Sequence, residues 1–188
     1  MPLLLILLVV ASRLLPHPPN VACVAAAGLF AGCHFGGWRA YLVPLAALGL
    51  SDLIGHIAGF PGLGFYHPIA MLSVYGGMLA SVPIGRRLRD RSPFWVPAGS
   101  LAASSVFFLS SNFGVWLAGW YSLSLAGLVA TYAAAIPFFG LTAVGDLIFS
   151  AVLFGVWELS RRPVRIPLDS RRDSSLRSHS AAVPATRV

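Results

Sequence analysis

The chain has 188 residues, of which 57% are hydrophobic and only 10% are charged, and its formal net charge is +7. Its mean hydropathy is +0.79, whereas soluble domains carry roughly 25% charged residues. Such a chain cannot cover a water-soluble core with polar surface. The composition therefore excludes a soluble protein and predicts an all-α integral membrane protein in contact with the lipid bilayer.

The distribution of the positive charge argues against a nucleic-acid partner. All 13 basic residues are arginines, and most of them gather in "RRLRDR" (86–91) and in the tail from Arg161 onward. Both clusters flank apolar runs, as the positive-inside rule expects of cytoplasmic segments. Aromatic residues do not interleave with the arginines, so we expect no nucleic acid to bind.

Taken in chain order, the apolar runs between Pro, Gly and Arg predict one bundle of about six transmembrane helices within residues 1–160. A helix needs ~20 residues to cross the hydrocarbon layer, so the first two runs are short. Residues 1–15 could also be a signal peptide, but they lack a basic start and an A-x-A cleavage site, which favours an uncleaved span. The predicted spans are 3–15, 21–36, 40–58, 68–85, 94–111 and 138–159.

A seventh apolar piece, at 123–136, complicates the count. If the arginines at 86–91 and those of the tail are both cytoplasmic, an even number of crossings separates them, and two spans already supply it. The piece is therefore predicted to be an outer or re-entrant helix, or an extension of a neighbouring span. The same rule predicts that both termini lie in the cytoplasm. Three polar loops then lie on the outer side, at 13–20, 59–68 and 110–122.

Other features predict what the chain lacks. The segment 161–188 is rich in Ser, Arg and Pro and is predicted to be a disordered basic cytoplasmic tail. Cys23 and Cys33 have no metal-ligand spacing and are interpreted as packing residues. No catalytic motif such as H-E-x-x-H or G-x-S-x-G occurs, so we expect no enzyme, no cofactor and no metal site.

Small residues form a stripe along the second apolar run. Gly28, Gly32 and Gly36 follow one another at four-residue spacing, with Ala27 and Ala31 beside them. On a helix this smooth surface lets another helix approach closely. Two interpretations remain open: packing inside the bundle, or a docking surface for a partner membrane subunit.

Two acidic residues, Asp52 and Asp146, lie deep in apolar runs, each followed by Leu-Ile. With the predicted topology both carboxylates fall in the outer half of the membrane. Intramembrane acids usually pair with another group or line a substrate path, and both interpretations are kept for each acid. His56 shares a helical face with Asp52 and is a candidate partner. The other candidates are Arg13, His17 and Asn112.

Some of these motifs resemble a known family. "PFFGLTAVGDLI" resembles the P-F-x-x-G-D-L segment of the substrate-binding S components of energy-coupling-factor (ECF) vitamin transporters, and "GLSDL" resembles the end of their third helix. The small-residue stripe is similar to the surface by which S components contact their coupling subunit. Ile148 stands where biotin-type subunits commonly have a lysine after G-D-L, which argues against biotin itself. More closely, residues 10–159 resemble a family of small bacterial membrane proteins without assigned function.

The resemblance implies an S-component-like bundle in the bacterial inner membrane that binds a vitamin-like nutrient from the outer side. No G-x-x-x-x-G-K-[ST] motif occurs, so transport would require a coupling transmembrane subunit and ATPase subunits. The alternative is a structural or assembly membrane protein with no ligand, in which the buried acids simply pair. The candidate substrate-binding residues are Asp52, His56, Asn112, Trp116 and Asp146, with Arg13 and His17.

Overall fold

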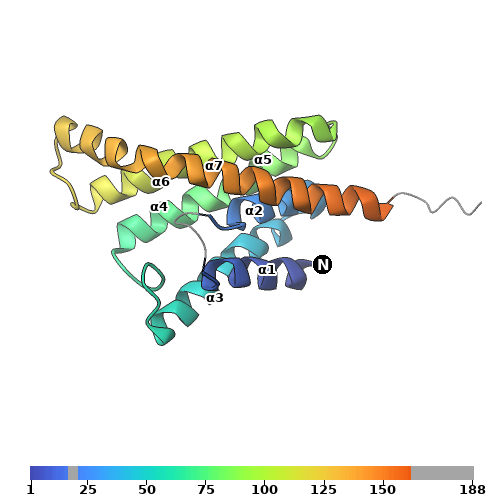
Figure 1. Ribbon diagram of the computed structural model, residues 1–188, viewed down its shortest axis with the longest axis horizontal. Coiled ribbons are helices and arrows are strands. Elements are labelled where there is room, and N and C mark those ends of the chain that lie inside the picture. Colours follow the sequence, from blue (N-terminus) through green and yellow to red (C-terminus); the bar gives the residue numbers. More distant parts are fainter. Residues whose placement is uncertain (17–20, 162–188) are drawn as a thin grey trace, which may run out of the picture.

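The computed structural model describes residues 1–16 and 21–161, and these residues form helices joined by short loops, with no strand among them. His17 and the predicted tail beyond Arg161 lie outside the described residues. The elements are α1 (Pro2–Leu14), α2 (Val24–His34), α3 (Arg39–Ala58), α4 (Pro68–Leu79), α5 (Ser81–Leu88), the 3₁₀ helix η1 (Pro93–Trp95), α6 (Val96–Leu117) and α7 (Leu125–Arg161) (Figure 1).

Four of the helical segments are long and apolar enough to cross a membrane: α3, the continuous pair α4–α5, η1 with α6, and α7. Large apolar side chains stand exposed on their outer faces, for example Ile57, Leu72 and Val129. In water such surfaces would aggregate, whereas hydrocarbon covers them without cost. The all-helical fold and these four segments support a membrane protein.

Helices α1 and α2 are too short to cross the hydrocarbon layer on their own. At 1.5 Å per residue, the 13 residues of α1 cover about 20 Å and the 11 residues of α2 about 16 Å, against about 30 Å of hydrocarbon. Figure 1 shows that the end of α1 and the start of α2 lie midway along the molecule. The six-span count is therefore not confirmed. Arg13, predicted to begin an outer loop at 13–20, instead belongs to α1 and lies inside the molecule against Asp52.

Helix α2 is the centre of the fold, and its nine residues from Val24 to Gly32 are all buried. Its glycines allow close contact with α5: a Cβ on Gly28 would lie 2.0 Å from Ser81 Oγ, and one on Gly32 would lie 2.1 Å from the Val82 carbonyl oxygen.

The small-residue stripe is therefore an internal packing surface, as one of the two interpretations had it. The docking surface for a partner subunit is a wrong expectation for Ala27, Gly28, Ala31 and Gly32, because the chain itself covers them. Gly36 lies beyond the end of α2 and has no atom close to its Cβ position.

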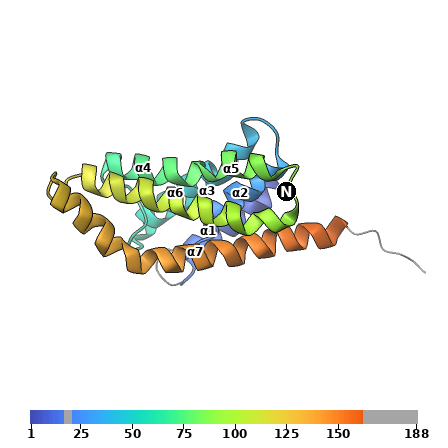
Figure 2. The ribbon, with the colours of Figure 1, turned by 90° about the horizontal axis from the view of Figure 1, so that it is seen from above.

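The segment 123–136 is not a separate outer helix but belongs almost entirely to α7, a single helix of 37 residues that contains Pro137. Proline removes one backbone hydrogen bond and clashes with the preceding turn, which kinks a helix when neighbouring contacts hold both parts. Figure 2 shows α7 bending in this region rather than ending. Among the sequence alternatives, the extension of a neighbouring span is the correct one.

The arginines of 86–91 hold one end of the molecule together. Arg89 donates hydrogen bonds to the carbonyl oxygens of Gly32, Cys33 and Phe35, at 2.7–3.3 Å. These carbonyls lie at the C-terminus of α2, where backbone oxygens lack helical partners and carry partial negative charge. The N-terminus, the α5–η1 turn and the end of α7 lie at this same end (Figure 1), called the arginine end below.

Candidate functional site

The main cavity of the protein has a volume of about 580 Å³ and lies between α1 and α3 on one side and α4, α6 and α7 on the other. It reaches from the interior ends of α1 and α2 to the loop between α3 and α4. Its polar wall groups are Arg13, Tyr66, Thr142 and Asp146, and most of the remaining lining is apolar, including Leu48, Phe60, Val74, Met78 and Phe107.

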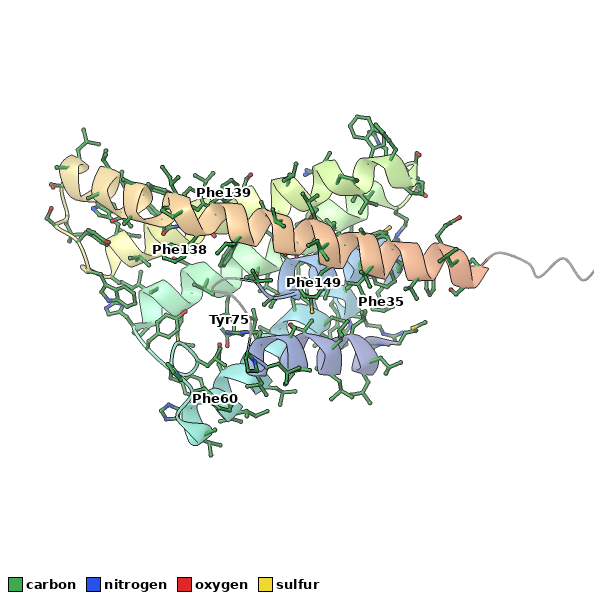
Figure 3. The ribbon with its side chains drawn as sticks, in the orientation of Figure 1. Phe35, Phe60, Tyr75, Phe138, Phe139 and Phe149 are labelled. Atoms are coloured by element: carbon green, nitrogen blue, oxygen red, sulfur yellow. The ribbon has the colours of Figure 1, made fainter. Side chains whose placement is uncertain are left out.

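Asp52 is held by two side chains at the edge of this cavity, Arg13 and Tyr75. Arg13 donates one N–H to Asp52 Oδ1 at 2.8 Å and another to Ser51 Oγ at 2.9 Å. The Tyr75 hydroxyl donates to the other carboxylate oxygen, Oδ2, at 2.7 Å. Figure 3 shows Tyr75 extending from α4 toward the α1–α3 side of the molecule. Each carboxylate oxygen thus has a strong donor, which offsets much of the cost of burying the charge.

This network decides which group faces the cavity. Arg13 lines the cavity, whereas Asp52 lies behind it and is not part of the wall. Arg13 occupies the last turn of α1, and the half-length of that helix is what brings the guanidinium to the depth of Asp52. The ion pair also connects α1 to α3.

Asp146 lies on the opposite wall with a different set of partners. The Ser104 hydroxyl of α6 is 2.6 Å from Asp146 Oδ2, and the backbone amide of Ala26 in the first turn of α2 faces the carboxyl group. The positive end of the α2 dipole therefore lies beside this acid. Cys23, the N-cap residue of α2, makes no side-chain cap there.

Asp146 belongs to a line of buried polar side chains between α6 and α7. Ser104 also contacts the Ser100 carbonyl oxygen at 3.1 Å, and Ser150 donates to the Ser100 hydroxyl at 3.2 Å. Thr142, one turn before Asp146, opens into the cavity. We name this line of Ser100, Ser104, Thr142, Asp146 and Ser150 the polar seam.

A second cavity of about 220 Å³ adjoins the first, since Val74, Phe107 and Thr142 line both. Asn112 lies in this smaller cavity, among Phe108, Phe138 and Phe139. Its amide N–H₂ donates to the Phe108 carbonyl oxygen at 2.8 Å. Asn112 is thus placed near the candidate site but not at the same wall as the two acids.

Two other predicted residues lie away from both cavities. His56 is exposed and packs edge-on against Phe65, with ring centroids 5.3 Å apart. It is therefore not the partner of Asp52, because its side chain points away from the bundle interior. Trp116 donates its indole N–H to the Ser122 carbonyl oxygen at 3.0 Å and packs against Phe113. It stabilises the α6–α7 loop rather than covering a cavity.

Sequence reasoning missed four polar residues of the site. Tyr75 sits in an apolar run where an isolated tyrosine usually indicates an interfacial anchor. Ser104 is one of many serines in α6 and has no distinguishing neighbour in sequence. Thr142 could have been found, because it precedes Asp146 by four residues and so shares its helical face. Tyr66 also lines the main cavity, where burial and then the nearby charge of Asp52 raise the pKa of its hydroxyl.

Within the described ranges no group of three or more His, Cys, Asp or Glu side chains could hold a metal ion.

Comparison with known proteins gives a family but no characterised relative. No curated protein and no solved structure matches the chain, and the resemblance to ECF S components is not shown. A family model does match residues 1–168. The protein therefore belongs to a family of unknown function, DUF6580.

Proposed function

We propose that the protein binds a small molecule inside the membrane, in the 580 Å³ cavity between the α1–α3 pair and the α4, α6 and α7 helices. The observation that carries this proposal is that Arg13 and Asp146, from opposite walls, open into one largely apolar cavity. Sites for small molecules typically have volumes of about 300–1,000 Å³ and apolar walls with a few convergent polar groups.

The half-length helices α1 and α2 add support. Helix ends inside a membrane leave unpaired backbone groups, which are tolerated where they line a cavity or are buried in protein. In transporters, interrupted helices commonly place their ends against the substrate. Leu14, Leu15 and Ala22, at the interior ends of this helix pair, line the main cavity.

The narrower form of the proposal is an S component that captures a vitamin-like nutrient for an ECF-type importer. It implies a bacterial inner membrane with the arginine end in the cytoplasm, as the positive-inside rule predicts. It rests on the short motifs around Asp52 and Asp146. The small-residue stripe gives it no support, because that surface is buried inside the chain, so the coupling and ATPase subunits would have to bind elsewhere.

One observation favours a second candidate, a structural or assembly membrane protein without a ligand. Within residues 1–16 and 21–161, every buried side-chain nitrogen or oxygen has a hydrogen-bond partner inside the protein. The polar groups of the cavity would then serve only to hold the helices in register.

Two threonines of α7 allow a matched test of these candidates. Thr142 and Thr131 are both buried, and each donates its hydroxyl to the carbonyl oxygen four residues earlier. Only Thr142 lines the cavity. Thr→Val keeps the shape and removes the hydroxyl, so Thr142→Val should lower ligand retention severalfold while Thr131→Val should not.

The measurement is native mass spectrometry of the detergent-purified wild type and both variants, with quantification of any small molecule that co-purifies. Binding is supported if the wild type and Thr131→Val carry the same molecule and Thr142→Val has lost most of it. A wild type that carries no molecule, even after incubation with an extract of small metabolites, supports the structural candidate instead.

A further inference from the structure

The formal charges of the cavity wall do not balance. Arg13 is neutralised by Asp52, at an N···O distance of 2.8 Å. Asp146 is buried, with only about 3% of the residue's surface exposed. In the part of the chain that the structure describes, the Arg13–Asp52 contact is the only ion pair, so Asp146 has no cationic side chain against it there. A carboxylate without a cationic side chain beside it is costly inside a bilayer.

A neutral Asp146 would avoid this cost, and the contacts of Ser104 accommodate it. A serine hydroxyl has one proton to donate, yet Ser104 Oγ lies 3.1 Å from the Ser100 carbonyl oxygen and 2.6 Å from Asp146 Oδ2. Both contacts are satisfied at once if Asp146 carries a proton and donates it to Ser104, which then donates to Ser100. The pair of contacts therefore fits a neutral carboxylic acid; the 2.6 Å length by itself does not, since bonds from a hydroxyl to a carboxylate are equally short.

The walls around this acid suit an organic cation. Phe60, Tyr66 and Phe107 line the same cavity, and aromatic faces attract cations most strongly where water is absent. The remaining lining is mainly aliphatic, which favours an apolar body. A ligand with one positive charge and an apolar body would restore neutrality at Asp146 and fill the cavity.

We propose, building on the proposed function, that the ligand is a small apolar molecule with one protonated amine, and that it displaces a proton from Asp146 on binding. The protonated carboxyl group releases one proton to solvent, and the resulting carboxylate then pairs with the ammonium group of the ligand. One positive charge enters the cavity and one leaves it. The site is therefore an exchange site for an organic cation and a proton.

Among the residues that the structure describes, the other charged or titratable groups around Asp146 do not supply this exchange. On α2, the Cys23 thiol donates to the Ser12 hydroxyl, and the Ala26 backbone amide that faces Asp146 does not titrate. On α1, Arg13 is engaged by Asp52 of α3, and α6 presents only serine hydroxyls. Tyr66, from the α3–α4 loop, has a raised pKa and stays neutral near pH 7. Asp146 is the group whose charge must change.

A charge series with one apolar body tests the proposal. The probes are 2-phenylethylamine, 2-phenylethanol and 3-phenylpropionate, and their binding to the purified full chain in detergent is measured by isothermal titration calorimetry. We expect the amine to bind at least tenfold more tightly than the alcohol, and the carboxylate not at all. Because the amine stays protonated below pH 9, its affinity should rise up to tenfold per pH unit while Asp146 is protonated in the free protein.

Repeating the titration in buffers of different ionisation enthalpy should show one proton released per amine bound. Asp146→Asn should abolish both the amine preference and the proton release, whereas Thr131→Val, on the same helix but away from the cavity, should keep both. If Asp146→Asn does not fold, the proton release and the charge preference of the wild type still decide the question.

The results separate this inference from the proposed function. Equal binding of the alcohol and the amine, or amine binding without proton release, overturns the cation–proton exchange and leaves a binding cavity. Tighter binding of the carboxylate overturns it in favour of recognition by Arg13. No binding by any of the three probes counts against both proposals.

Discussion

Asp52 and Asp146 stand in similar local sequences and are equally buried, yet the protein surrounds them in opposite ways. Asp52 faces a guanidinium and a phenol hydroxyl, both at hydrogen-bond distance. Asp146 faces a serine hydroxyl and the first turn of a helix. The first arrangement surrounds its acid with donors alone, whereas the second gives its acid a hydroxyl that can either donate or accept.

This difference assigns separate tasks to two regions of the molecule. The α1–α3 region uses its acid as a cross-link, because the Arg13–Asp52 pair joins a short helix to a long one. The α6–α7 region places its acid in the polar seam, beside a cavity. The substitutions below test this contrast, from the largest expected effect to the smallest.

Arg13→Gln should cause the largest loss of stability. It leaves the Asp52 carboxylate buried with the Tyr75 hydroxyl as its remaining strong donor, and breaking one partner of a buried ion pair typically costs about 3–5 kcal/mol. The free energy of unfolding is measured in mixed micelles with increasing sodium dodecyl sulfate.

The double variant Arg13→Gln with Asp52→Asn removes both charges together and controls for the lost side-chain packing. It should recover part of the stability, since no uncompensated charge remains. Equal losses for the single and the double variant would contradict a charge-based cross-link between α1 and α3.

Tyr75→Phe should have an intermediate effect. It removes a hydrogen bond of 2.7 Å to an ionised acceptor, and such bonds contribute about 1.5–3 kcal/mol to stability. Tyr132→Phe is the matched control, because that hydroxyl also makes a 2.7 Å bond, but to the neutral Leu109 carbonyl oxygen at an exposed site. The same unfolding assay should show a loss for Tyr75→Phe at least twice that for Tyr132→Phe. Similar losses would contradict a charge-assisted hydrogen bond from Tyr75 to Asp52.

The sequence predicted the long helices well, because each is a sustained apolar run and hydrophobic length alone indicates a span. It did not predict the depth of α1 and α2. Their runs look like short spans, and only tertiary packing around the buried α2 shows that both helices end inside the molecule. The continuity of α7 was left open for a related reason: Pro137 ends a helix or kinks it depending on the contacts on either side.

The candidate site was predictable only in part. A deep aspartate in an apolar run is visible in any sequence, and Arg13 was among the candidate partners of Asp52. Choosing among those partners needs the fold, because His56 is nearer in sequence but points outward. Tyr75 and Ser104 come from other helices, and no local pattern indicates which tyrosine or serine will face an acid.

Ser104→Ala gives the smallest effect and the sharpest test of the contrast. If Asp146 is a neutral acid in the empty protein, removing its serine partner costs about 1 kcal/mol, the usual net value of a hydrogen bond between neutral groups. If Asp146 is ionised, the loss should approach that of Arg13→Gln, because the carboxylate would lose its only side-chain donor within the described residues. Ser105→Ala is the control, since that hydroxyl also bonds to the carbonyl oxygen four residues earlier but is exposed. Near pH 6 we expect a loss of about 1 kcal/mol for Ser104→Ala and little change for Ser105→Ala. A loss above about 3 kcal/mol would mean that both acids carry fixed charges and that the two regions do not differ.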